Sequence, residues 1–77
     1  MPADAHRVVY RREDLPALFG IVDELRMRFP ELRTTDVANA VGRRYERMGV
    51  GRRGGVPDDF ADLVADDLAK QHFVGAI

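Results

Sequence analysis

The stretch that decides the fold is Leu15–Phe29, which reads LPALFGIVDELRMRF. Five of its apolar residues follow a 3-4-3-4 spacing: Leu15, Leu18, Val22, Leu25 and Phe29. This spacing places them on one face of an α-helix. Phe19 and Ile21 widen the face on either side, so that it covers about 160° of the helix circumference. Because one partner helix needs a narrower stripe, we expect this helix to contact at least two others.

The rest of the chain predicts two more helices. Asp14 is a good N-cap for the first helix, and Pro30 disfavours helical geometry in the residue before it. Gly49 is a suitable end for the second helix, and Pro57 followed by carboxylates suits the start of the third. The predicted fold is all-α, a three-helix bundle with helices at about 14–29, 34–48 and 57–73.

The 77 residues are enough for one domain. We expect residues 1–13 to form an N-terminal extension, in which Val8-Val9-Tyr10 makes a short extended piece that packs on the helices. Residues 14–77 form the predicted bundle, and residues 49–55 are expected to be a flexible loop because four of the seven are glycine.

Composition limits what such a chain can do. A domain of this size buries only about 60% of its unfolded surface, and the absence of cysteine excludes disulfides, so association with another chain is the expected source of extra stability. The net charge of −1 gives no bulk attraction to nucleic acid or to an anionic membrane. No stretch resembles a signal peptide or a membrane span, so we expect a cytoplasmic protein.

The sequence contains no set of residues that would carry catalysis. Serine and cysteine are absent, and His6 and His72 lie near opposite ends of the chain without neighbours at ligand spacing. The segment Gly49–Gly54 matches G-x-G-x-x-G, but it follows a predicted helix where the dinucleotide fingerprint requires a strand. We therefore expect no enzyme activity, no metal and no cofactor.

Charge is distributed unevenly over the second half of the chain. Residues 43–53 carry a net charge of +4 and residues 58–67 a net charge of −5. Four arginines form a candidate nucleic-acid patch: Arg43, Arg47, Arg52 and Arg53. The acidic third helix argues against an approach by DNA, and a solvated basic edge that faces a protein partner is the alternative. In an isologous dimer the basic edge of one chain would also meet the acidic helix of the other.

Arg44 and Asp67 each fall within the apolar arc of their predicted helix. Because an unpaired buried charge is costly, we predict that each reaches a partner, possibly the other, within one chain or across a dimer. The alternative is that Arg44 extends to water and Asp67 lies at the edge of its helix.

The chain resembles the actinobacterial three-helix bundle dimerisation domain over roughly residues 15–73. The resemblance is carried by LRMRFPEL at residues 25–32, by the apolar positions that follow in the second helix, and by VPDDF at residues 56–60. Such domains occur alone or ahead of low-molecular-weight phosphatase-like proteins such as arsenate reductases, whose Cys-x5-Arg loop is absent here. The resemblance implies a three-helix fold and self-association without an activity. Asp66 and Asp67, where that family tends to be basic, and a longer glycine-arginine loop are departures from it.

The predicted function is a non-enzymatic protein–protein interaction module that forms a homodimer through apolar surface of the first and third helices. The candidate interface residues are Leu18, Phe19, Ile21, Val22, Leu25, Phe60, Val64 and Phe73. The alternative is a small dimeric DNA-binding or antitoxin-like regulator that uses the patch between Arg43 and Arg53. A third hypothesis is an accessory domain that docks on a larger partner protein through its first helix.

Overall fold

The computed structural model describes residues 8–73, which contain α-helices and one 3₁₀ turn but no strand. The elements in chain order are η2 (Arg12–Asp14), α1 (Leu15–Arg28), α2 (Thr34–Met48), α3 (Val50–Arg53) and α4 (Phe60–His72). The prediction of an all-α fold with three main helices is confirmed. The remaining residues, 1–7 and 74–77, lie outside the described part, and so does the candidate His6.

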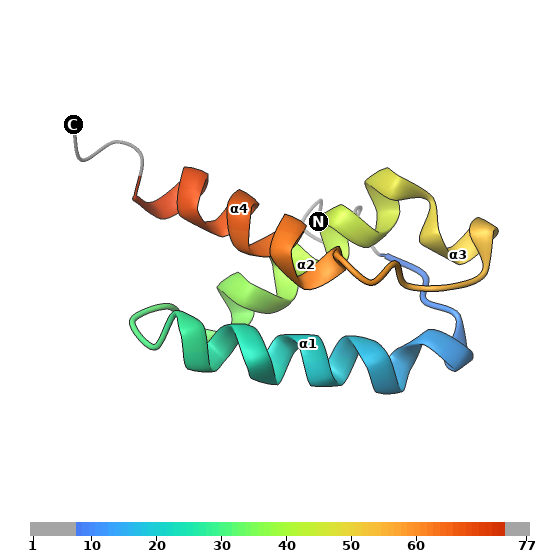
Figure 1. The fold of residues 1–77 in the computed structure, drawn as a ribbon, viewed down its shortest axis with the longest axis horizontal. Coiled ribbons are helices and arrows are strands. Elements are labelled where there is room, and N and C mark those ends of the chain that lie inside the picture. The colour runs from blue at the N-terminus through green and yellow to red at the C-terminus, as the bar shows by residue number, and fades with distance from the viewer. Residues whose placement is uncertain (1–7, 74–77) are drawn as a thin grey trace, which may run out of the picture.

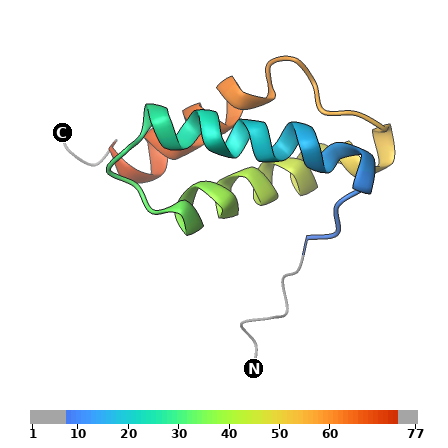
Figure 2. The same cartoon turned by 90° about the horizontal axis from the view of Figure 1, so that it is seen from below.

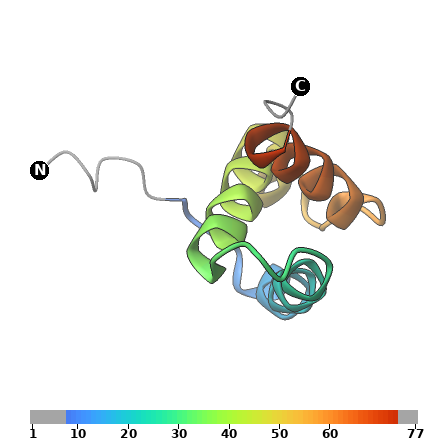
Figure 3. The ribbon, with the colours of Figure 1, turned by 90° about the vertical axis from the view of Figure 1, so that its left-hand side faces the viewer.

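The three long helices surround one core. α2 packs against both α1 and α4, and α1 also contacts α4. Figure 1 shows α1 as the lower layer with α4 above it, and the end view in Figure 3 shows α1, α2 and α4 around a common centre. In Figure 2 the chain is seen from the side of α1, and no described element covers α1 on that side.

The core draws on every helix of the described chain. Its largest fully buried side chains are Tyr45, Phe60, Leu25, Leu68, Val37, Val50 and Val64. Complete burial of one such aliphatic side chain contributes about 1.5–3 kcal/mol relative to its exposure to water. Half-buried Ile21 and Val22 of α1, and Phe29 directly after it, pack against this core. Phe19, which was also expected to widen the apolar face, is 64% exposed.

Two of the predicted helix starts need correction. Asp14 was expected to cap α1, but it has helical backbone angles and its side chain makes no capping hydrogen bond. The third long helix begins at Phe60, three residues later than predicted, because the Phe60 amide donates to the Pro57 carbonyl and closes a turn there. α2 has the predicted bounds, and the Arg33 amide donates to the Asp36 carboxylate at 3.4 Å at its start.

The prediction that residues 49–55 form a flexible loop is wrong for their central part, which is the short helix α3. Val50 anchors this helix because its side chain is 1% exposed and belongs to the core. Gly49 and Gly54 flank α3 with φ angles of 67° and 86°, a left-handed conformation that favours glycine. The first and last glycines of the G-x-G-x-x-G segment therefore mark the ends of α2 and α3.

The N-terminal segment Val8–Arg11 has no regular structure, and Val8 and Tyr10 pack on α2 as predicted. Val9, which was expected to pack with them, is 85% exposed. The rings of Tyr10 and Tyr45 lie 4.9 Å apart between centroids. A Cβ atom at Gly42 would lie only 2.7 Å from the Tyr10 hydroxyl oxygen, so glycine at this position lets the Tyr10 side chain approach α2 closely.

Candidate interaction surfaces

The charged pair predicted from the helix faces is present within one chain. Arg44 on α2 donates to Asp67 on α4 through Nε at 3.0 Å and through Nη2 at 2.7 Å. Both side chains are largely buried, and the Arg44 guanidinium also donates to the Leu63 carbonyl at 3.4 Å. Arg47 donates at 3.0 Å to Oδ2 of Asp67, the oxygen that also accepts from Nε of Arg44. Two-pronged contacts of this kind are among the stronger charged interactions in proteins and fix the register of α2 against α4.

The candidate nucleic-acid patch is divided by the fold. Arg43 donates to the side-chain oxygen of Gln71 at 3.0 Å, and Arg47 is committed to Asp67. Arg52 and Arg53 are exposed on α3. Two of the four candidate residues thus hold α4 on α2, and this arrangement does not favour the regulator hypothesis.

A buried network around the Tyr45 hydroxyl was not predicted. This hydroxyl donates to the Asp14 carboxylate at 2.7 Å and accepts a hydrogen bond from the Arg11 backbone amide at 3.0 Å. Burial is the main cause that raises the pKa of Tyr45 above 10.0, and the bond to Asp14 acts in the same direction. The only sequence signal was indirect, because a tyrosine on an apolar helix face needs a partner for its hydroxyl. Asp14 supplies that partner where a helix cap was expected.

Four of the candidate interface residues are core residues. Leu18 is 3% exposed, and Leu25, Phe60 and Val64 are fully buried. Because these four residues pack inside one chain, they offer no surface to another folded chain. They are therefore core residues and not the interface residues that the sequence predicted. Their burial also follows from the 3-4 spacing, which selects the face that the other helices cover.

The remaining candidates keep part of their surface. Ile21 and Val22 are half-buried, and Phe73 is exposed at the end of α4, where its ring stacks on Phe29 with centroids 6.1 Å apart. Phe19 is 64% exposed. Of the eight candidates, Phe19 and Phe73 are therefore the large apolar groups that water reaches most.

Phe19 belongs to a second apolar surface on α1, which we call the outer face. It consists of the exposed residues Pro16, Ala17, Phe19, Gly20 and Met27. Met27 is 83% exposed and was missed as a candidate, although its spacing from Pro16, Gly20 and Asp23 is also helical. Asp23 lies within this face, four residues from both Phe19 and Met27, and it forms an exposed ion pair with Arg26 at 3.9 Å.

Residues 8–73 hold no group of three or more His, Asp or Glu side chains that could bind a metal ion. His72 lies beside the Phe73 ring at the end of α4, with centroids 6.4 Å apart. Every buried side-chain nitrogen or oxygen in the described range has a hydrogen-bond partner. None of the helices described is long and apolar enough to cross a membrane.

The chain was compared with models of protein families, with curated proteins and with solved structures. No family model, no curated protein and no solved structure matches it. The resemblance to the actinobacterial dimerisation domain therefore stays a prediction.

Proposed function

We propose that this chain is a non-enzymatic interaction module of the cytoplasm that forms a homodimer through the outer face of α1. The observation that carries the proposal is the exposure of Phe19 and Met27 on a helix whose opposite face is already buried. Core formation accounts for Leu18 and Leu25 but not for large apolar side chains on the solvent side. Phe19 and Met27 lie eight residues apart on the solvent side of α1, and exposed large apolar side chains on one helix face are a feature of protein-binding sites.

A second copy of the same helix suits the shape of this face. A Cβ atom built at Gly20 would meet nothing within 4 Å, so a second helix has room to approach closely there. In an antiparallel pairing with a two-fold axis between Gly20 and Asp23, Pro16 of one chain lies opposite Met27 of the other. The pairing then brings apolar groups together at both ends of the contact, as a self-complementary interface requires.

Charge does not oppose this pairing. Asp23 and Arg26 pair at 3.9 Å within one chain, so the two charges that each chain brings to the contact sum to zero. The small size of the domain adds to the argument, because folded chains that bind each other are stabilised by mass action.

The contact is expected to be weak. The 14 residues of α1 span about 21 Å, and one helix face of this length buries a few hundred Å² per partner. Stable interfaces typically bury about 800 Å² per partner, so we expect dissociation in roughly the micromolar range.

Light scattering over a dilution series tests the proposal. The molar mass should rise from 8.7 kDa toward twice that value as the concentration increases through the micromolar range. A mass that stays at 8.7 kDa at the highest concentration would contradict self-association.

A disulfide experiment tests the antiparallel geometry. The double variant Pro16→Cys with Met27→Cys should form a covalent dimer under mild oxidation, because the two positions face each other across the two-fold axis. Met27→Cys alone is the matched control and should crosslink little. Efficient crosslinking of that single variant would instead indicate a parallel pairing.

A further inference from the structure

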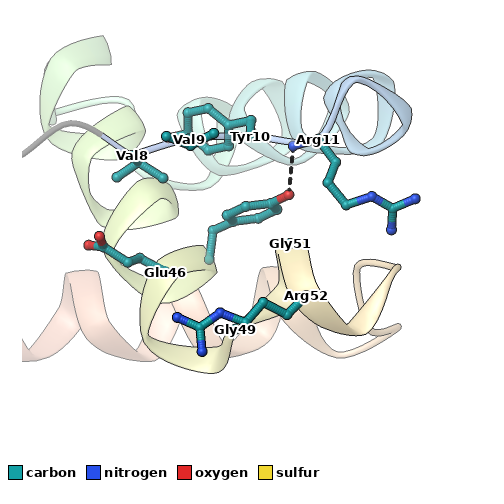
Figure 4. Close-up of a pocket in the computed structure, with 9 residues that line it drawn as sticks. Val8, Val9, Tyr10, Arg11, Glu46, Gly49, Gly51 and Arg52 are labelled. Atoms are coloured by element: carbon teal, nitrogen blue, oxygen red, sulfur yellow. Dashed lines mark hydrogen bonds between the residues drawn. The ribbon is translucent and has the colours of Figure 1, made fainter.

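The segment Val8–Arg11 lies against the second half of α2 and continues into η2 (Figure 4). Successive side chains of an extended chain point to opposite faces. Val8 and Tyr10 contact α2, whereas Val9 between them is 85% exposed. Arg11 has extended backbone angles, with φ of −75° and ψ of 139°. The segment therefore contacts α2 as an extended chain does, through every second side chain.

Gly42 and Tyr45 form a notch on α2 that receives these two side chains. A Cβ atom at Gly42 would lie 2.7 Å from the Tyr10 hydroxyl oxygen and 3.4 Å from a methyl carbon of Val8. The Tyr10 ring packs on the Tyr45 ring with an angle of 52° between their planes. Because glycine weakens a helix interior, helix formation does not explain Gly42, whereas contact with an extended segment does.

The segment fills the notch but leaves open space on two sides. A hollow of about 350 Å³ borders it toward the end of α2, and one of about 330 Å³ borders it toward the first half of that helix. Among the described residues, its one backbone hydrogen bond to α2 runs from the Arg11 amide to the Tyr45 hydroxyl at 3.0 Å and is dashed in Figure 4. Release of the segment would leave this hydroxyl bonded to Asp14, so its oxygen could accept an N–H from another segment.

We propose that the notch docks an extended Val-x-Tyr segment of a partner protein, and that Val8–Arg11 occupies the notch in cis and keeps it closed. The chain's own segment identifies this occupant, because it shows which side chains the notch accepts and at which spacing. A tethered segment has an effective concentration of about millimolar size, so it excludes a weakly binding partner until it is released. The notch lies on α2, and the proposal does not depend on dimer formation through α1.

An NMR titration of the full chain with the substitution Tyr10→Ala tests the proposal. Loss of the Tyr10 ring opens the notch, and the probe is a peptide blocked at both ends with the sequence of residues 8–12, VVYRR. The amide signals of Gly42 and Tyr45 should shift and saturate with a dissociation constant of about millimolar size, as expected for so short a peptide. The wild type should bind the same peptide at least about tenfold more weakly, because its own segment competes.

Matched controls separate the notch from general peptide binding. Val9→Ala changes the neighbouring side chain, which faces solvent, and should leave the notch closed as in the wild type. A peptide with alanine in place of tyrosine keeps the charge and should give no saturable shift. Addition of Gly42→Ala to Tyr10→Ala places a methyl group in the notch and should abolish binding of VVYRR. Absence of binding by Tyr10→Ala, equal binding by the wild type, or equal binding of the two peptides would overturn the proposal.

Hydrogen exchange in the wild type tests release of the segment without any substitution. The Arg11 amide should exchange at least about tenfold faster than the amides of the fully buried residues Leu25 and Leu68, because release of the segment does not require unfolding of the core. Exchange of the Arg11 amide at the rate of these core amides would mean that the segment leaves only when the whole domain unfolds, and it would overturn the proposal.

Discussion

The two faces of α1 differ sharply although both are rich in apolar residues. On the inner face Leu18 and Leu25 are buried by α2 and α4, whereas on the outer face Phe19 and Met27 remain open to water. Both faces have helical spacing, so periodicity alone identifies the helix but does not say which apolar residues face the core. Folding explains the inner face, and the proposed self-association is our account of the outer face. The acidic residues of α4 also include a largely buried and an exposed side chain, and so do the two tyrosines.

The largest expected effect comes from the inner face of α1. Leu25→Ala should lower the free energy of unfolding by about 3 kcal/mol, because it leaves a cavity in the core. Met27→Ala, two positions away on the outer face, should change it by less than about 0.5 kcal/mol. Chemical denaturation of both variants, at a concentration where the wild type is monomeric, measures the difference. Similar losses of unfolding free energy in the two variants would contradict the assignment of one face to the core and the other to solvent.

The next effect concerns the acidic residues of α4. Asp67→Ala should cost about 2 kcal/mol, because it leaves the largely buried Arg44 without its carboxylate partner. Asp62→Ala removes an exposed carboxylate that pairs with Arg28 at 3.4 Å, and it should cost less than about 0.5 kcal/mol. Thermal and urea unfolding of the two variants compare these costs. Equal effects would mean that the Arg44–Asp67 pair does not hold α2 to α4.

The two tyrosines provide a smaller contrast. Tyr45→Phe should cost about 1–2 kcal/mol, because the buried Asp14 carboxylate loses the hydroxyl that donates to it. Tyr10→Phe removes a hydroxyl from a partly exposed side chain and should cost less. Urea unfolding near pH 7 gives both values. A larger loss for Tyr10→Phe would show that the Tyr10 hydroxyl, and not the Tyr45 hydroxyl, holds the N-terminal segment in place.

Unfolding at alkaline pH gives a second test of the role of the Tyr45 hydroxyl. Burial raises the pKa of Tyr45 above 10.0, so the folded chain keeps this proton to higher pH than the unfolded chain does. The contribution is fully present below pH 10 and is lost as the pH rises through the folded pKa. Burial and the charge of Glu46 raise the pKa of Tyr10 as well. Stability should therefore fall above pH 10, and less steeply in Tyr45→Phe. An equal slope in that variant would contradict the assignment to Tyr45.

More of the fold than of the candidate interaction surfaces could be predicted from the sequence. The 3-4 spacing and the helix-ending Pro30 and Gly49 act locally, so they predict the helices. The charges on apolar arcs indicate that Arg44 and Asp67 each need a partner, and the fold makes them partners of each other. The α3 helix was missed because its four residues depend on burial of Val50, a tertiary contact that overrides the glycine-rich composition. The role of Asp14 was missed for a similar reason, since its partner Tyr45 lies 31 positions away. Met27 was missed because nothing in a single helix pattern marks the side that the other helices leave open.

The measurement that tests the central claim most directly is the self-association of an outer-face variant. Phe19→Ser with Met27→Ser removes the two exposed large apolar side chains of α1 without touching the core. We predict that this variant keeps the circular dichroism spectrum and unfolding midpoint of the monomeric wild type, and that its mass stays at 8.7 kDa in light scattering at concentrations where the wild type is dimeric. A variant that still dimerises with wild-type affinity would contradict the assignment of the contact to the outer face of α1.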